Sequence, residues 1–175
     1  SVSAVHGTLR RRRVGQLPNL GGLASDRGIS HRVARRWLSV PEASLVALRL
    51  QPHFRNFGKR PAKSPKLYFL DTGLLCQLPR IREAEDLAIH ASRGGIFESF
   101  VAAELYKRAM GAGAVPDLYF WRDSAGNEVD LVLDRGTRPI PAEMKSGKTV
   151  SADFFKGLEL WRRLTEEDFG PAALA

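Results

Sequence analysis

The sequence predicts a mixed α/β protein with two domains, and three observations support this. Segments of helical and strand periodicity alternate along the 175 residues, a length that suits one or two domains. The hydrophobic share of 43% and the charged share of 26% are typical of globular proteins. Residues 1–70 carry 14 Lys and Arg against 2 Asp and Glu, whereas residues 71–175 carry 13 against 17. We therefore expect a basic domain over residues 1–70 and a second domain over residues 71–175.

The first domain has the pattern of two short helices followed by a basic hairpin. Asn19 and Ser30 each precede a segment of helical character, and both side chains can cap a helix. Two apolar stretches, residues 44–50 and 67–70, read as strands on either side of a loop rich in Lys and Arg. Asp71 is expected to cap a further helix directly after the second strand. A helix pair followed by a basic-tipped hairpin is the layout of a winged helix.

Positive charge on the second helix and on the hairpin loop indicates a surface for DNA. Arg and Lys bind phosphates, Arg can reach guanine edges in the major groove, and a serine at a helix start can bind phosphate. The alternatives are a protein-binding winged helix and a solvated basic surface. The residues expected to contact nucleic acid are Ser30, Arg32, Arg35, Arg36, Lys59, Arg60, Lys63 and Lys66.

The second domain reads as one helix, three strands and another helix, in that order. Residues 94–110 have the pattern of a long amphipathic helix, and Ser151 can cap a last helix that runs to about residue 164. This order predicts a layered α/β structure in which helices pack on a sheet. The three strands are expected at residues 118–122, 128–133 and 138–144, with turn residues between them.

An acid within a strand and an acid–lysine pair on the next strand form the candidate catalytic site. Asp130 interrupts an apolar run, where an unpaired acid would be costly to bury. Glu143 and Lys145 are two residues apart, so on a strand they point to one face. Two carboxylates can share Mg²⁺, and a lysine beside them can hold a phosphate. We expect Mg²⁺ on Asp130 and Glu143, with Lys145 assisting phosphodiester cleavage; the alternative is a set of ordinary ion pairs, such as Asp130 with Arg122.

A further acid is expected from the first helix of this domain. Helical periodicity places Phe97, Val101 and Leu105 on the inward face of that helix. Glu104 lies near the middle of this stripe and Glu98 lies at its margin. Geometry alone therefore slightly favours Glu104.

Several other chemistries find little support in the sequence. "SGKT" at residues 146–149 resembles the end of a P-loop, but Ala142 stands where that motif needs glycine, so we expect no ATPase activity from this chain. The single cysteine, Cys76, excludes an internal disulfide and a cysteine-built zinc site. We find neither a signal-peptide pattern nor an apolar run near the roughly 20 residues of a membrane span. We therefore expect a cytoplasmic protein without membrane contact.

Five stretches carry a resemblance to a known family: "LASDRGISHRVARRWLSVPEAS", "RNFGKRPAKSPKLYFLDTGLL", "GGIFESFVAAELYK", "LYFWRDSAGNEVDLVL" and "PAEMKSGKT". They resemble the C-terminal region of predicted AAA+ ATPases of bacteria and archaea, catalogued as a domain of unknown function. The resemblance implies a winged helix followed by a restriction-endonuclease-like domain of the PD-(D/E)xK type. It implies catalytic roles for Glu98, Asp130, Glu143 and Lys145, and so favours Glu98 over Glu104.

The family normally has an N-terminal P-loop ATPase domain, so the resemblance implies that this chain is a C-terminal fragment with that domain as a partner. Pro18 and Pro41 depart from the family pattern, which usually has leucine at both positions. We expect a DNA-binding module that cleaves phosphodiesters with Mg²⁺, and an oligomer is compatible with this role. The alternatives are an inactive nuclease fold that binds DNA or regulates the ATPase, and a protein-interaction arm.

Overall fold

The computed structural model describes part of the chain, and this part has a mixed α/β fold, which confirms the predicted fold class. The described residues are 39, 42–53, 65–77, 79–136, 139–147 and 149–169. The two helices expected before residue 39, the basic hairpin loop and the segment after residue 169 lie outside them. The chain divides into two compact units: Ser1–Leu50 with Ser64–Pro116, and Gln51–Lys63 with Asp117–Ala175.

These units differ from the expected domains, because the second strand of the hairpin and the long helix belong to the same unit. The expected boundary at residue 70 depends on a winged helix that lies largely outside the described residues. Both the boundary and the winged helix stay predictions.

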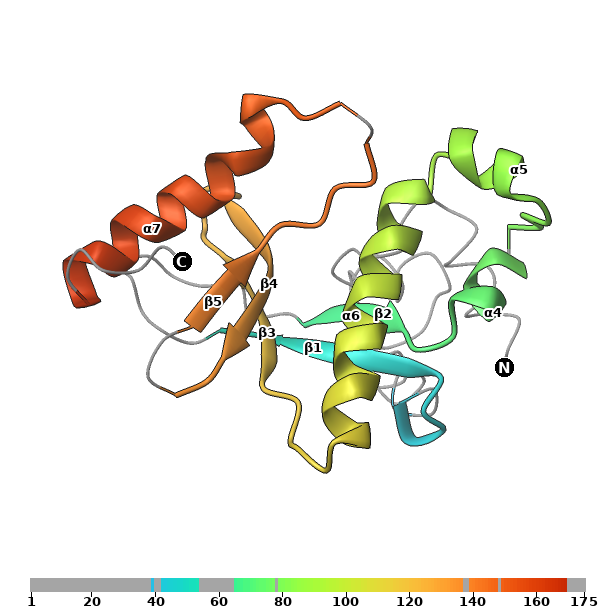
Figure 1. Ribbon diagram of the computed structural model, residues 1–175, viewed down its shortest axis with the longest axis horizontal. Helices are drawn as coiled ribbons and strands as arrows, with labels where there is room; N and C mark the ends of the chain where they lie inside the picture. Colours follow the sequence, from blue (N-terminus) through green and yellow to red (C-terminus); the bar gives the residue numbers. More distant parts are fainter. Residues whose placement is uncertain are drawn as a thin grey trace, which may run out of the picture. The chain divides into compact units, whose positions relative to one another are not determined.

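In its described residues, the first unit combines an antiparallel strand pair with three helices (Figure 1). Strand β1 (Ala47–Pro52) pairs with β2 (Lys66–Phe69), and Leu48 lies opposite Tyr68. The predicted strand pair is therefore confirmed, with ends shifted by a few residues. The helices are α4 (Thr72–Gln77), α5 (Ala84–Ile89) and α6 (Arg93–Gly111). Of these, α5 had no counterpart in the sequence prediction.

Helix α6 confirms the long helix expected at residues 94–110. The inward stripe was wrong, however, because the side chain expected at its start, Phe97, is 37% exposed. The buried residues of α6 are instead Ile96, Ser99, Ala102 and Ala103. Small side chains at these positions let the helix backbone pack closely, and α6 contacts β2.

The second unit is built on three antiparallel strands, and these confirm the three predicted strands. They are β3 (Leu118–Arg122), β4 (Glu128–Asp134) and β5 (Pro139–Ala142). The last residues of β1 pair in parallel with β3, with Gln51 opposite Tyr119. The hydrogen-bonded order of the strands is β2-β1-β3-β4-β5.

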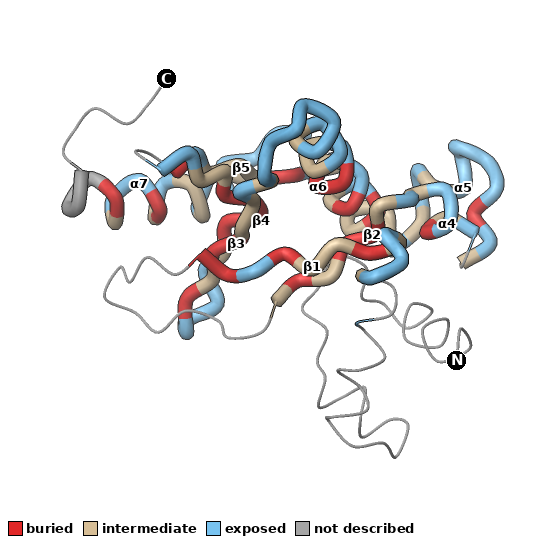
Figure 2. The backbone as a smooth tube through the Cα atoms, turned by 90° about the horizontal axis from the view of Figure 1, so that it is seen from below, coloured by how far each residue is buried: buried red, intermediate tan, exposed pale blue. Residues whose placement is uncertain are grey.

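The core of the second unit lies between this sheet and the last helix. A 3₁₀ turn, η1 (Ala152–Phe155), leads into α7 (Lys156–Phe169), which confirms the last predicted helix, although Ser151 forms no side-chain cap. Trp161 of α7 is 2% exposed and packs with Trp121, Val129 and Val132. The rings of Trp161 and Trp121 meet edge to face at 5.8 Å. The middle of β4, residues 129–132, is buried and includes Asp130, and Figure 2 colours this part of the strand red.

The turn between β3 and β4 is organised by the buried side chain of Asp123. Its Oδ1 accepts hydrogen bonds from the backbone N–H groups of Ala125 and Asn127, both at 2.9 Å. Its Oδ2 accepts a third from the side-chain amide of Asn127 at 2.7 Å. Gly126, with φ of 90°, supplies the left-handed conformation that the turn requires.

Candidate functional site

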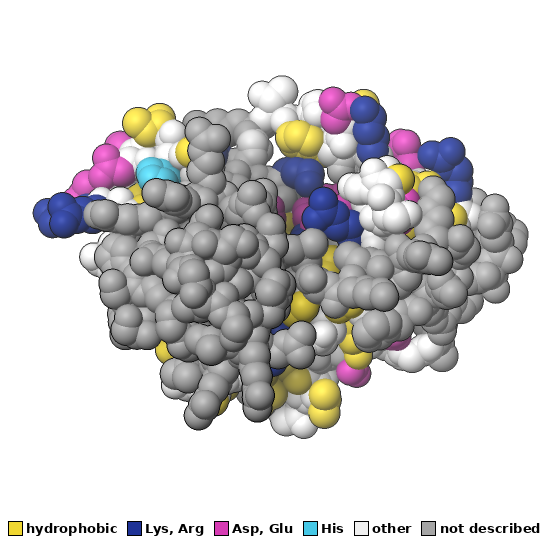
Figure 3. All heavy atoms as spheres, turned by 180° about the vertical axis from the view of Figure 1, so that it is seen from behind, with side chains coloured by type: hydrophobic (Ala, Val, Ile, Leu, Met, Phe, Trp, Pro, Cys, Tyr) yellow, Lys and Arg dark blue, Asp and Glu magenta, His cyan; other side chains and the backbone are white. Residues whose placement is uncertain are grey.

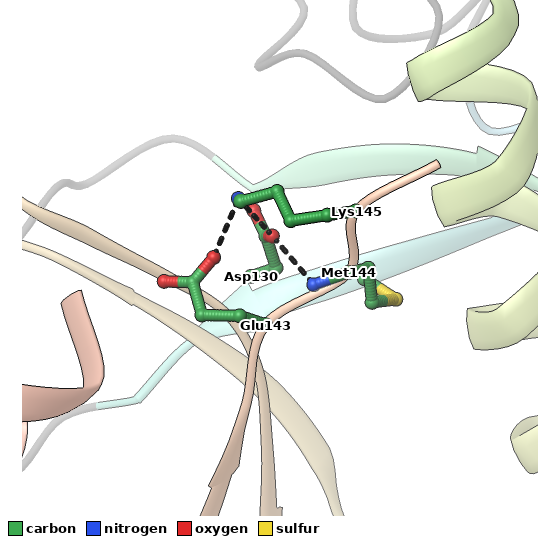
Figure 4. A network of polar contacts seen from close by, with 4 residues as sticks. All are labelled: Asp130, Glu143, Met144 and Lys145. Carbon is green, nitrogen blue, oxygen red and sulfur yellow. Dashed lines mark hydrogen bonds and ion pairs between the residues drawn. The ribbon is translucent and has the colours of Figure 1, made fainter. Parts of the chain in front are cut away.

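Asp130, Glu143 and Lys145 come together in the second unit, just beyond the end of β5 (Figure 4). The Nζ atom of Lys145 lies 2.7 Å from Oε2 of Glu143 and 3.2 Å from Oδ2 of Asp130. The side chains of both acids are 10% exposed, whereas that of Lys145 is 37% exposed. One partly exposed ammonium thus bridges two largely buried carboxylates.

The carboxylate of Asp130 is fixed by the backbone of the next segment. Asp130 lies on β4 between two fully buried side chains, Val129 and Leu131, and its Oδ2 accepts the N–H of Met144 at 3.0 Å. Leu131 pairs with Ala142, the last residue of β5. The strand was expected to reach residue 144, but beyond Ala142 the Asp130 side chain takes the role of a backbone acceptor. This side-chain bond explains why β5 ends early.

Burial and charge together perturb the protonation of the site. The pKa of Glu143 is raised to about 7. Burial is the largest cause, a hydrogen bond with Asp130 and the charge of Asp130 also raise it, and Lys145 lowers it. Burial disfavours the ammonium of Lys145, but Glu143 and Asp130 outweigh this effect and raise the pKa of Lys145. Two negative groups therefore share one positive group, which leaves Glu143 partly protonated near neutral pH.

The two acids fit a hard divalent cation in their chemistry, although they make only two ligands. Both are oxygen donors, both are largely buried, and both already converge on one cation, the ammonium of Lys145. Within the described ranges, no group of three or more His, Cys, Asp and Glu side chains is placed to hold a metal. Water or a phosphate would have to supply the remaining ligands, as is usual for Mg²⁺.

The fourth expected catalytic residue belongs to the other unit. Glu98 is half-buried on α6. Glu104, which geometry alone favoured, has a side chain that is 51% exposed and forms an ion pair with Lys107. The structure thus brings three of the predicted catalytic residues together within one unit and assigns Glu98 to the first unit.

Of the expected nucleic-acid contacts, Lys66 is the one within the described residues. It is the first residue of β2, pairs with Leu50 across the strands, and is 2% exposed. This burial departs from the exposed position that the prediction assumed. On the face drawn in Figure 3, the described Lys and Arg side chains lie beside Asp, Glu and hydrophobic side chains. The basic surface stays a prediction.

The second unit also contains a polar pair that the sequence analysis did not predict, His53 with Asp134. His53, directly after β1, is 3% exposed, and its Nε2 lies 3.1 Å from Oδ2 of Asp134. The His53 ring also meets the rings of Tyr119 and Trp161 edge to face, at 5.5 and 5.6 Å. His53 and Asp134 are 81 residues apart, so no local pattern could have linked them.

Comparisons with known proteins match both halves of the chain to families without an assigned function. Two curated relatives, uncharacterized proteins of Mycobacterium bovis and Mycobacterium tuberculosis, are each 36% identical over 138 residues, which is 78% of this chain and 30% of theirs. The chain therefore spans about 30% of the length of these relatives. No solved structure matches it. None of the helices in the described ranges has the length and apolar character to cross a membrane.

Two family models match, and neither covers half of the chain. Residues 8–85 match a domain of unknown function, DUF8612. Residues 93–174, which contain all four expected catalytic residues, match a second domain of unknown function, DUF4143. This match confirms the part of the resemblance that assigned the chain to a domain of unknown function.

Proposed function

We propose that this chain is a DNA-binding module whose second unit hydrolyses phosphodiesters with Mg²⁺. The observation that carries the proposal is the ammonium of Lys145 between two largely buried carboxylates, at 3.2 Å from Asp130 and 2.7 Å from Glu143. Such acids are costly to bury unless a cation compensates them. A partly exposed lysine beside a cation-binding pair of acids suits a substrate that carries negative charge.

In this proposal each residue has a separate task. Asp130 and Glu143 would hold Mg²⁺, and the bond from the N–H of Met144 keeps the Asp130 carboxylate in place. The metal would polarise the phosphate and lower the pKa of an attacking water. Lys145 would leave the acids when the metal binds and contact the scissile phosphate, for which its exposure of 37% gives it access. The family resemblance adds Glu98 as a further catalytic acid.

The remaining parts of the proposal concern the whole protein. The basic residues of the first 70 positions would bind DNA through a winged helix. The relatives are longer than their matched part, which leaves room for a P-loop ATPase domain. We propose that the chain is the C-terminal part of such an ATPase and acts in the cytoplasm, where Cys76 stays reduced.

One observation favours a second candidate function, an inactive nuclease fold that binds DNA or regulates the ATPase. Lys145 already forms ion pairs with both acids, and the described residues show no third metal ligand beside them. A structural ion-pair cluster would look the same without any metal. The two candidates differ in whether the chain binds a divalent cation.

Calorimetry with Mn²⁺ and Mg²⁺ separates the two candidates. The nuclease proposal expects the wild type to bind and Asp130→Asn to bind at least about tenfold more weakly, since a ligand charge is lost. Asp117→Asn is the matched control, because it makes the same change at an exposed position of the same unit. Equal binding by Asp130→Asn would refute the assigned ligands. Absence of binding by the wild type would replace the nuclease proposal with the inactive fold.

A further inference from the structure

We infer that Gly157 is a positioning residue, which holds the Glu143 carboxylate in place from the side opposite Lys145. Its role in metal binding rests on the function proposed above. Gly157 is the second residue of α7 and touches neither metal nor substrate in this proposal. It acts through Glu143.

Gly157 lies so close to Glu143 that no side chain fits at this position. A Cβ atom added to Gly157 would overlap two oxygen atoms, the backbone carbonyl oxygen of Glu128 and Oε1 of Glu143. Among the described glycines, Gly157 alone has so severe an overlap. Gly94, the second residue of α6, has open space around the same position, and a Cβ on Gly147 would find ordinary contacts from 3.6 Å.

The two oxygens of Glu143 therefore have different neighbours. Oε2 accepts from Nζ of Lys145, and Oε1 lies against the backbone of α7 at Gly157. Figure 4 shows the carboxylate between the lysine and the side on which α7 is drawn in pale red. The carboxylate is thus held between a charged side chain and a helix backbone.

Helix α7 cannot move away from this contact without losing packing. Leu158 directly follows the glycine and packs against the core cluster that contains Trp161. The other oxygen at Gly157 belongs to Glu128, which lies on β4 two residues before Asp130. Gly157 therefore sets the distance between α7 and the strand that carries the first acid.

A side chain at position 157 would take the space of Oε1 and force the Glu143 carboxylate out of its present position beside Lys145. The metal proposed above needs both acids at one point, so its affinity should depend on this glycine. A purely structural glycine would lower stability whether or not Glu143 carries a carboxylate. This difference makes the inference testable without any metal.

The test is a double-mutant cycle in EDTA, with thermal unfolding of wild type, Gly157→Ala, Glu143→Ala and the double variant. Gly157→Ala lowers Tm in the wild-type background and in the Glu143→Ala background. If Gly157 holds the carboxylate, the loss of Tm in the Glu143→Ala background is smaller by at least about 4 °C. Equal losses of Tm in both backgrounds would overturn the inference. Gly94→Ala is the matched control, since it makes the same change at the second residue of a helix with open space.

Failure of Gly157→Ala to fold would also give an answer. A folded double variant would then show that the carboxylate contact causes the failure, which supports the inference. If both unfold, the overlap with the Glu128 carbonyl dominates and the inference is wrong.

Titration with Mn²⁺ then tests the role of Gly157 in the proposed site. We expect Gly157→Ala to bind Mn²⁺ at least about tenfold more weakly than wild type, and Gly94→Ala to bind like wild type. Unchanged affinity in Gly157→Ala would refute the positioning role. If the wild type binds no Mn²⁺, the proposed function fails, while the cycle in EDTA still decides whether Gly157 holds Glu143.

Discussion

The carboxyl group of Glu143 should make the protein less stable as the pH rises through the neutral range. Its pKa is about 7 in the folded protein against an ordinary value of 4.5, so the folded state holds this proton more tightly than the unfolded state. Stability from this group is complete below about pH 4.5 and is lost as the pH rises through about 7. At roughly 1.4 kcal/mol per pKa unit, the loss between pH 4.5 and 8 is about 3 kcal/mol.

Replacing Glu143 by Gln removes this titration and keeps nearly the same shape. Glu143→Gln should therefore gain about 2.5 kcal/mol relative to wild type when the pH changes from 5 to 8. Lys145 does not contribute in this window, because its raised pKa keeps it charged in both states. Oε1 lies against Gly157 and burial is the largest cause of the shift, so the value depends on an intact site.

Urea unfolding in EDTA, followed by tryptophan fluorescence, measures this difference at pH 5 and at pH 8. Asp117→Asn controls for the loss of any carboxylate, since Asp117 is exposed. The reasoning would be refuted if Glu143→Gln and wild type differed in free energy of unfolding by the same amount at pH 5 and at pH 8. A change of the opposite sign would show that Lys145 controls Glu143 and that the folded state favours its ionised form.

Two further predictions test the packing of each unit. Trp161→Ala should lower the free energy of unfolding by about 3–5 kcal/mol and remove the near-ultraviolet circular dichroism of the ring pair, because Trp161 is 2% exposed in the core of the second unit. Ile96→Ala should cost about 2–4 kcal/mol, whereas Phe97→Ala should cost less than about 1 kcal/mol, since Ile96 is 4% and Phe97 37% exposed. Urea unfolding measures these costs. A larger cost for Phe97→Ala than for Ile96→Ala would show that the inward face of α6 is the one predicted from the sequence.

Local patterns in the sequence were sufficient to predict most of the described elements. The strands at residues 118–122 and 128–134 follow from apolar residues separated by turn residues. Asp71 was expected to cap the helix after the hairpin, and its Oδ1 accepts the N–H of Leu74 at 3.0 Å. These features depend on residues close in sequence, so one chain segment carries the whole signal.

The candidate site could be predicted in part for the same reason. An acid inside an apolar strand and a Glu-x-Lys pair on the next one are unusual enough to be noticed, and these three residues do meet. The sequence could not show that Asp130 binds the backbone of Met144 and thereby ends β5. Nor could it show that Gly157, 14 residues beyond Glu143, lies against the carboxylate.

The sequence by itself therefore determined the α/β class, the positions of the described strands along the chain, and the identity of the acids and the lysine that meet. The tertiary structure decided which face of α6 is buried, where β5 ends, and that His53 meets Asp134 across 81 residues. It also decided that burial raises the pKa of Glu143. The physical reason is the same in each case: packing and desolvation depend on residues far apart in the chain, which no local periodicity records.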